Sequence, residues 1–177
     1  FSDEDSIDSI VDTIETSYHS QYRIYICTLK IMSKEQLDIL GTVHTLSLDY
    51  CSGMVELSAL GGVHTLLLNT CGDLVDVSTL GSVHTLSLCY CYNLRDFSNL
   101  GSVHTLSLYS CRGVTDVSTF RSVHTLVIHN CGNIEDVSAL GEVHTLSLRS
   151  CHSLVDVSAL SSVHTLTLDY CHSVVDV

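Results

Sequence analysis

Histidine recurs once every 20 residues along most of this chain, and a column of imidazoles can bind metal ions or sense pH. The members of this column are His44, His64, His84, His104, His124, His144 and His164. Imidazole binds zinc, copper and nickel and titrates near neutral pH. Zinc needs ligands that converge on one point, whereas a straight row of parallel side chains does not converge. We therefore expect no metal site, and we interpret the column as structural, hydrogen-bonded to neighbouring backbone or threonine hydroxyls. A metal-binding or pH-sensing stripe is the functional alternative.

Hydroxyl and carboxylate side chains form two further columns with the same period. The hydroxyl column contains Thr45, Thr65, Thr85, Thr105, Thr125, Thr145 and Thr165, and the acidic column contains Glu56, Asp76, Asp96, Asp116, Asp136, Asp156 and Asp176. A flat hydroxyl array could bind ice, but Leu67 and Val127 interrupt the neighbouring serines. One carboxylate per repeat is poor for calcium. We expect the aspartates, with the serines that follow them, to accept backbone N–H bonds in a short turn.

Cysteine follows the period as well, at Cys51, Cys71, Cys91, Cys111, Cys131, Cys151 and Cys171. A thiol that always occurs in the same local context indicates a buried structural position, and the odd total of nine leaves at least one unpaired. These two points predict an intracellular, reducing compartment, most simply the cytoplasm. Cys89 is off the period, and we expect it to be an incidental surface residue. Identical rows of His, Ser, Cys and Asp provide no single activated nucleophile in a pocket, so we predict no enzyme activity and no cofactor.

The elements that carry these columns follow from one repeat, which begins at Val43 and runs seven times to Val177. Each copy reads V-H-T-L-x-L-x-x-C-x-x-L-x-D-V-S-x-L-x-x with conservative changes, and we number its positions 1 to 20 from the valine. Alternating apolar residues at positions 4 and 6 predict a strand. Positions 12, 15 and 18 bring the chain back along the far side, and the glycine usual at position 19 is expected to allow a tight turn. Because one such unit cannot bury its own apolar side chains, the units must stack.

The strand segment V-x-x-L-x-L-x-x-C-x-x-L resembles the cysteine-containing form of the leucine-rich repeat. The segment D-V-S-x-L that follows it resembles the return segment of internalin-type and SDS22-like repeats, and similar repeats occur in trypanosomatid and amoebal giant-virus proteins. The resemblance covers residues 43–177. It implies an α/β solenoid: a right-handed leucine-rich-repeat coil with one parallel sheet on its concave face and short 3₁₀ or extended segments on its convex side.

Residues 1–42 depart from the repeat. Apolar side chains from Ile7 to Tyr18 have helical spacing, residues 22–27 alternate as a strand does, and the run from Ser33 to Gln36 is a capping-box pattern that opens a short helix. In leucine-rich-repeat terms this segment is an N-terminal helical cap with an atypical first repeat. We therefore divide the chain into a cap, residues 1–42, and seven repeats, residues 43–177, of which the last is incomplete.

The overall charge restricts the partners of this domain. The chain has 7 basic and 20 acidic residues and a formal net charge of −13. Phosphate backbones and anionic lipid surfaces are bound by lysine and arginine, so we expect neither nucleic acid nor membrane as a partner. No apolar run approaches the roughly 20 residues that a membrane-spanning helix needs.

Information about a partner lies where the repeats differ from one another, at positions 7, 8 and 10 just after each strand. Tyrosine, arginine and histidine are frequent there, and the first two often dominate the energetics of protein interfaces. The candidate binding residues are Tyr50, Tyr90, Tyr92, Tyr109, Arg112, His129, Arg149, His152, Tyr170 and His172. We predict a non-catalytic scaffold that binds a protein along this edge, on the concave and ascending-loop side of the solenoid. The alternative is an assembly protein, for instance a component of a virion or another large complex, that self-associates through the uncapped C-terminal end of its core.

Overall fold

The computed structural model describes residues 23–27, 33–50, 57–131 and 133–174. The strands are β1 (Arg23–Cys27), β2 (Thr45–Asp49), β3 (Thr65–Asn69), β4 (Thr85–Cys89), β5 (Thr105–Tyr109), β6 (Thr125–His129), β7 (Thr145–Arg149) and β8 (Thr165–Asp169). The helical segments are α2 (Lys34–Leu40) and six 3₁₀ turns, η1 (Ser58–Gly62), η2 (Ser78–Ser82), η3 (Ser98–Ser102), η4 (Ser118–Ser122), η5 (Ser138–Glu142) and η6 (Ser158–Ser162). From β2 onward, strand and 3₁₀ turn alternate with the period of the sequence.

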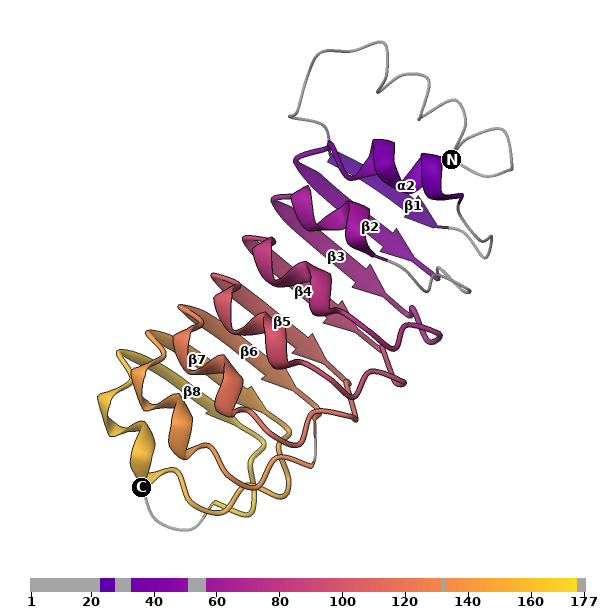
Figure 1. The fold of residues 1–177 in the computed structure, drawn as a ribbon. Coiled ribbons are helices and arrows are strands. Elements are labelled where there is room, and N and C mark those ends of the chain that lie inside the picture. Colours follow the sequence, from indigo (N-terminus) through magenta and orange to yellow (C-terminus); the bar gives the residue numbers. More distant parts are fainter. Residues whose placement is uncertain (1–22, 28–32, 51–56, 132, 175–177) are drawn as a thin grey trace.

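The described strands form one parallel sheet in which each strand pairs with the next along the chain, from β1 to β8 (Figure 1). The register is the sequence period itself: Thr45 pairs with Thr65, and Thr65 with Thr85. Every repeat position therefore becomes a row across the sheet, as the pattern predicts. Because the sheet has no crossovers, each coil contacts mainly the coils before and after it.

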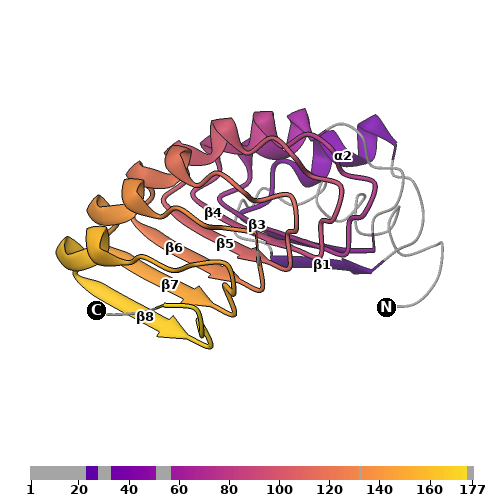
Figure 2. The ribbon, with the colours of Figure 1, turned by 90° about the horizontal axis from the view of Figure 1, so that it is seen from below.

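The 3₁₀ turns form a layer opposite the sheet (Figure 2), and the buried core side chains come from the strands and from the return segments. In the third strand Leu66 and Leu68 are fully buried, and the return segment contributes Leu74, Val77 and Leu80, of which none is more than 1% exposed. Burying a side chain of this size stabilises a fold by about 1.5–3 kcal/mol relative to leaving it in water. The repeat therefore meets the expectation that stacked units bury what one unit cannot.

The sequence suggests that glycine at position 19 allows a tight turn. In the structure this glycine instead allows close packing between neighbouring coils. Gly61, Gly81, Gly101 and Gly141 have no left-handed backbone conformation. A Cβ at Gly81 would lie 2.5 Å from the carbonyl oxygen of Asn99 in the next coil, and at Gly61 the corresponding distance to Thr79 O is 2.8 Å. The expectation of conformational freedom is therefore wrong, because the constraint comes from the neighbouring coil and cannot be seen in a single repeat.

Part of the predicted cap is present in the structure. Strand β1 pairs with β2, and α2 begins with the predicted capping box: Ser33 Oγ accepts from the Gln36 N–H, and the Gln36 side chain accepts from the Ser33 N–H. The expected amphipathic helix in residues 1–22 lies outside the described residues, and the boundary between residues 42 and 43 stays a prediction. In the described part of the chain, no helix has the length and apolar character needed to cross a membrane.

Candidate interaction surface

The backbone at position 8, directly after each strand, adopts the left-handed conformation in every repeat. This position is occupied by Tyr50, Thr70, Tyr90, Ser110, Asn130, Ser150 and Tyr170, with φ between 52° and 56°. In the first six, the backbone N–H donates to the position-7 carbonyl of the next coil, at 2.8–2.9 Å. Residues other than glycine adopt this conformation at a cost. In these six coils the side chain at position 8 therefore leaves the sheet edge from a backbone that the next coil holds in place.

Three of the predicted binding residues form a central cluster at the ends of β4 and β5. The rings of Tyr90 and Tyr92 lie 6.0 Å apart, and the guanidinium carbon of Arg112 lies 5.5 Å from the centre of the Tyr92 ring. Tyr90 is 44% exposed and Tyr92 is 41% exposed. Arginine over an aromatic face is a favourable cation–π arrangement. The cluster is therefore an exposed aromatic surface with the Arg112 guanidinium placed over one of its rings.

Other predicted residues gather beside this cluster and toward the C-terminal end. Tyr109 and His129 make an edge-to-face contact at 5.7 Å where β5 and β6 end. His152 stacks on His172 at 6.2 Å, and Tyr170 contacts His172 at 6.0 Å. Between the central and terminal groups, small residues stand at position 8: Ser110 is buried and accepts a hydrogen bond from the Asn130 side chain at 3.0 Å.

The two remaining predicted residues are Tyr50, at the N-terminal end of the row, and Arg149, in the coil before the last. Tyr50 is 48% exposed at the end of β2, two coils before Tyr90. Arg149, at the end of β7, lies 3.9 Å from the Asp169 carboxylate, and both side chains are about half exposed. An ion pair this long and this exposed contributes little to stability, so the Arg149 guanidinium remains available to a partner.

The cysteines at position 9 from Cys71 to Cys151 lie beneath this edge and are buried. Cys91, Cys111, Cys131 and Cys151 are fully buried, and the Cys111 thiol donates to the Leu88 carbonyl of the preceding coil at 3.4 Å. Burial raises the pKa of Cys91 to about 12 and that of Cys131 to about 11. Cys89, which the sequence places at the surface, is half-buried, and burial together with the nearby Asp49 carboxylate raises its pKa. Thiolate chemistry is disfavoured at these positions.

The acidic column caps the return turns, as the sequence predicts. Oδ1 of Asp76, Asp96, Asp116, Asp136 and Asp156 accepts the backbone N–H of the serine two residues later, at 2.7–2.9 Å. That hydrogen bond lowers the pKa of each aspartate below its ordinary value. Because these carboxylates already serve the backbone, their repetition indicates a structural role. Glu56 and Asp176 lie outside the described residues.

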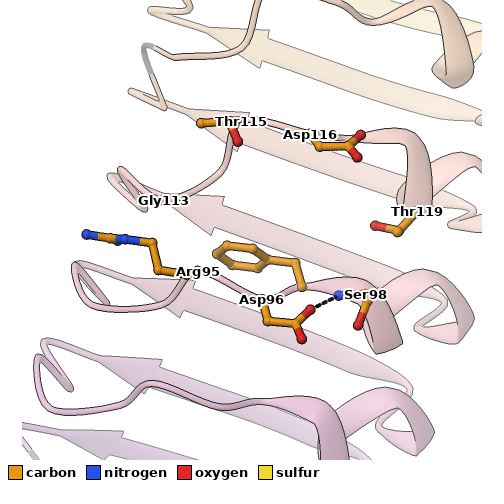
Figure 3. A pocket seen from close by; sticks show the side chains of 8 residues that line it. Arg95, Asp96, Ser98, Gly113, Thr115, Asp116 and Thr119 are labelled. Atoms are coloured by element: carbon orange, nitrogen blue, oxygen red, sulfur yellow. Dashed lines mark hydrogen bonds between the residues drawn. The ribbon is translucent and has the colours of Figure 1, made fainter.

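One small hollow lies between two of these turns on the return side of the coils (Figure 3). Its volume is about 140 Å³, and its lining includes Arg95, Asp96, Phe97 and Asp116. Asp96 accepts from the Ser98 N–H (the dashed line in Figure 3), and the Arg95 guanidinium donates to the Tyr92 and Leu94 carbonyls. Small-molecule sites usually enclose about 300–1,000 Å³. This hollow is smaller, and its charged groups are already engaged.

The structure resembles two bacterial proteins of known structure. It superposes on an internalin (inlF) from Listeria monocytogenes with a TM-score of 0.60 over 93% of this chain, at 18% sequence identity. Internalin C2 (inlC2) from the same species matches with a TM-score of 0.53 over 78% of the chain, at 20% identity. The fold is a leucine-rich-repeat solenoid. This result confirms the architecture that the repeat pattern predicts, including the single parallel sheet and the 3₁₀ segments opposite it.

The likeness concerns the fold of the solenoid alone. The chain spans about half the length of the internalin inlF, 54%, and 67% of internalin C2. No family model matches the sequence, and no curated protein matches it. What the solenoid binds must therefore be argued from its own surface.

Proposed function

We propose that this solenoid is a non-catalytic scaffold that binds a protein along the edge where its strands end. The observation that carries the proposal is the exposure of four tyrosines at that edge: Tyr50 (48%), Tyr90 (44%), Tyr92 (41%) and Tyr170 (63%). Three of them stand at position 8 on left-handed backbone, and for Tyr50 and Tyr90 a hydrogen bond to the next coil holds that backbone in place. The central cluster of Tyr90, Tyr92 and Arg112 is the proposed centre of the interface.

The physical argument rests on the cost of ordering side chains during binding. Tyrosine offers a large contact area with only two rotatable side-chain bonds, so a partner loses little affinity in immobilising it. Arg112 rests over Tyr92, which restricts the guanidinium before a partner arrives. Tyrosine and arginine are also the residue types that most often dominate measured binding energies. An acidic chain with this edge suits a protein partner better than a nucleic acid.

The test is affinity capture from the native source with four forms of the solenoid: wild type, Tyr90→Ala, Arg112→Ala and Val155→Ala. Val155 is 49% exposed but lies on the return segment, away from the edge, so its variant is the matched control. Loss of a central contact residue costs about 2 kcal/mol or more, which weakens binding about 30-fold. We expect a partner that the wild type and Val155→Ala retain and both edge variants lose. Equal recovery of every captured protein by all four forms would refute the proposal.

A second proposal concerns assembly through the last coil. Val163, Leu166 and Leu168 are only half-buried there, whereas the residues at the same positions of the preceding coil, Val143, Leu146 and Leu148, are buried. A neighbouring molecule stacked on this coil would complete its apolar layer. Light scattering coupled to size-exclusion chromatography tests this idea, because assembly requires a mass that rises with concentration. A constant monomer mass would refute the assembly proposal, and the scaffold proposal would then stand by itself.

We also propose that the solenoid functions in a reducing compartment. In support, the buried thiols at position 9 donate to backbone carbonyls of their own and the preceding coil, as Cys111 does to Tyr109 and Leu88. Fluorescence microscopy of the tagged protein, with thiol alkylation before lysis, would test the compartment and the redox state together.

A further inference from the structure

The histidine column forms a stacked ladder along the edge where the strands begin, opposite the tyrosine edge. Neighbouring rings lie 4.5–4.6 Å apart from His44 to His164. Five of the six pairs are nearly parallel, with 12–17° between ring planes, and the sixth, His144 with His164, is tilted by 34°. All seven side chains are exposed. The ladder is therefore a continuous row of accessible imidazoles.

One nitrogen of six of the seven rings is held by a threonine hydroxyl. From His44 to His144, Nδ1 hydrogen-bonds the Oγ1 of the threonine that follows, at 3.1–3.3 Å. A histidine that ligates a metal typically donates its other ring N–H to an oxygen, which fixes the tautomer and leaves a lone pair for the ion. When Nδ1–H donates to threonine, Nε2 carries that lone pair. In that tautomer the threonine column supports the ladder in the way an outer shell supports metal ligands.

We propose that neighbouring rings of the ladder bind Cu²⁺ in pairs, each ion held by two Nε2 atoms, with water in its remaining positions. Imidazole suits copper, and among the divalent ions of the first transition row Cu²⁺ binds most tightly to a given nitrogen site. In the described part of the chain, no three His, Cys, Asp or Glu side chains are arranged to hold a metal. The ladder therefore offers open two-ligand sites and not the closed tetrahedral site that the sequence argues against.

The geometry requires the two exposed rings of a pair to turn toward one ion, because each nitrogen lone pair lies in its own ring plane and the stacked planes are nearly parallel. With metal–nitrogen bonds of about 2.0–2.1 Å, two adjacent ligands of one ion have their nitrogens about 3 Å apart. Rings that stack at 4.6 Å with 13° between their planes therefore have to bring their Nε2 atoms closer and turn until both ring planes contain the ion. The planes of His144 and His164 are tilted by 34° at the same 4.6 Å centroid distance, so the angle between two rings can widen while their centroid spacing is unchanged. Rings two coils apart, about 9.5 Å, cannot share an ion.

This adjacency requirement allows a test with two variants of identical histidine content. The alternating variant carries His64→Gln, His104→Gln and His144→Gln, which leaves four ladder rings without a neighbour. The contiguous variant carries His124→Gln, His144→Gln and His164→Gln, which leaves the four rings from His44 to His104 as an intact stack. All other histidines, including the stacked pair His152 and His172, are the same in both. Circular dichroism verifies that both variants fold.

Each chain is titrated with Cu²⁺ alone at about pH 7.5, and binding is followed by calorimetry and electron paramagnetic resonance. Seven rings provide three separate pairs and four stacked rings provide two, so the contiguous variant should bind one ion fewer than the wild type. The alternating variant should lose all three of these sites, and any ladder binding left should be at least about 10-fold weaker. Copper-loaded wild type should show two nitrogen ligands per ion.

Several results would overturn the proposal. Equal stoichiometry and affinity in the two triple variants would show that adjacency does not matter. Loss of all ladder sites in the contiguous variant would show that stacked neighbouring rings are not sufficient to bind Cu²⁺. Independently of the variants, a wild-type spectrum with a single nitrogen ligand at saturation would exclude paired binding, so the proposal remains testable even if one variant fails to fold.

Discussion

Replacing Gly81 with alanine tests whether position 19 is governed by the distance between coils. The new Cβ would lie 2.5 Å from Asn99 O, whereas ordinary contacts begin at 3.4 Å, so the two backbones must move apart by about 0.9 Å. Overpacking of this kind costs about 1–3 kcal/mol. Alanine also restricts the unfolded chain, which returns about 0.4–1 kcal/mol. We therefore expect Gly81→Ala to lower the free energy of unfolding by about 1–2 kcal/mol.

Gly72→Ala is the matched control, because a Cβ at Gly72 meets nothing within 4 Å. There only the effect on the unfolded chain remains, and we expect stabilisation by about 0.4–1 kcal/mol. For a chain of this length 1 kcal/mol shifts the Tm by about 2–4 °C, so thermal melts should move in opposite directions. The effect should also follow the contact: smaller for Gly61→Ala at 2.8 Å, larger for Gly101→Ala, where the Thr119 carbonyl is closer still.

Urea and thermal unfolding followed by circular dichroism would measure these differences. Arg121 and Ser161 occupy the same repeat position, so a Cβ can be accommodated where the neighbouring coil has adjusted to it. The prediction therefore applies to the coils that now contain glycine. If Gly81→Ala melted at or above the temperature of Gly72→Ala, close approach of the coils would not be the reason for glycine, and the explanation based on packing would fail.

Three further predictions concern other rows of the solenoid. Thr70→Gly should raise the free energy of unfolding by about 1 kcal/mol in denaturant melts, because a β-branched residue at φ 55° is strained and glycine is not; an unchanged or lower value would argue against strain at position 8. Asp96→Ala should destabilise the solenoid at pH 7 and make little difference once the carboxyl is protonated. The folded-state pKa of Asp96 is lowered by the Ser98 N–H, so its contribution is complete above the ordinary carboxyl pKa and is lost as pH falls through the folded value; equal destabilisation at both extremes of pH would contradict this. Maleimide labelling of the native protein, mapped by mass spectrometry, should modify Cys91 and Cys111 far more slowly than half-buried Cys89, and unfolding should remove the difference.

Much of the architecture follows from the repeat alone. When every unit has the same apolar positions, stacking them in register is the arrangement that buries all of them, so Leu66 must lie beside Leu86 and His64 beside His84. The aspartate caps could be inferred for the same reason, since Asp76 and Ser78 lie within one turn and need no other coil. These features are local or strictly periodic, and one sequence contains all the information they require.

Other features depend on the backbone of a neighbouring coil, which no single repeat reveals. The left-handed conformation at position 8 is stabilised by a bond such as Tyr90 N–H to Tyr109 O, and tyrosine, threonine and serine give no sequence signal for it beyond the one asparagine, Asn130. The contact of Arg112 with Tyr92 joins two coils as well. The sequence by itself determined the rows, because periodicity implies register. Only the tertiary structure decided the distances and angles between rows, because these are set by packing between coils.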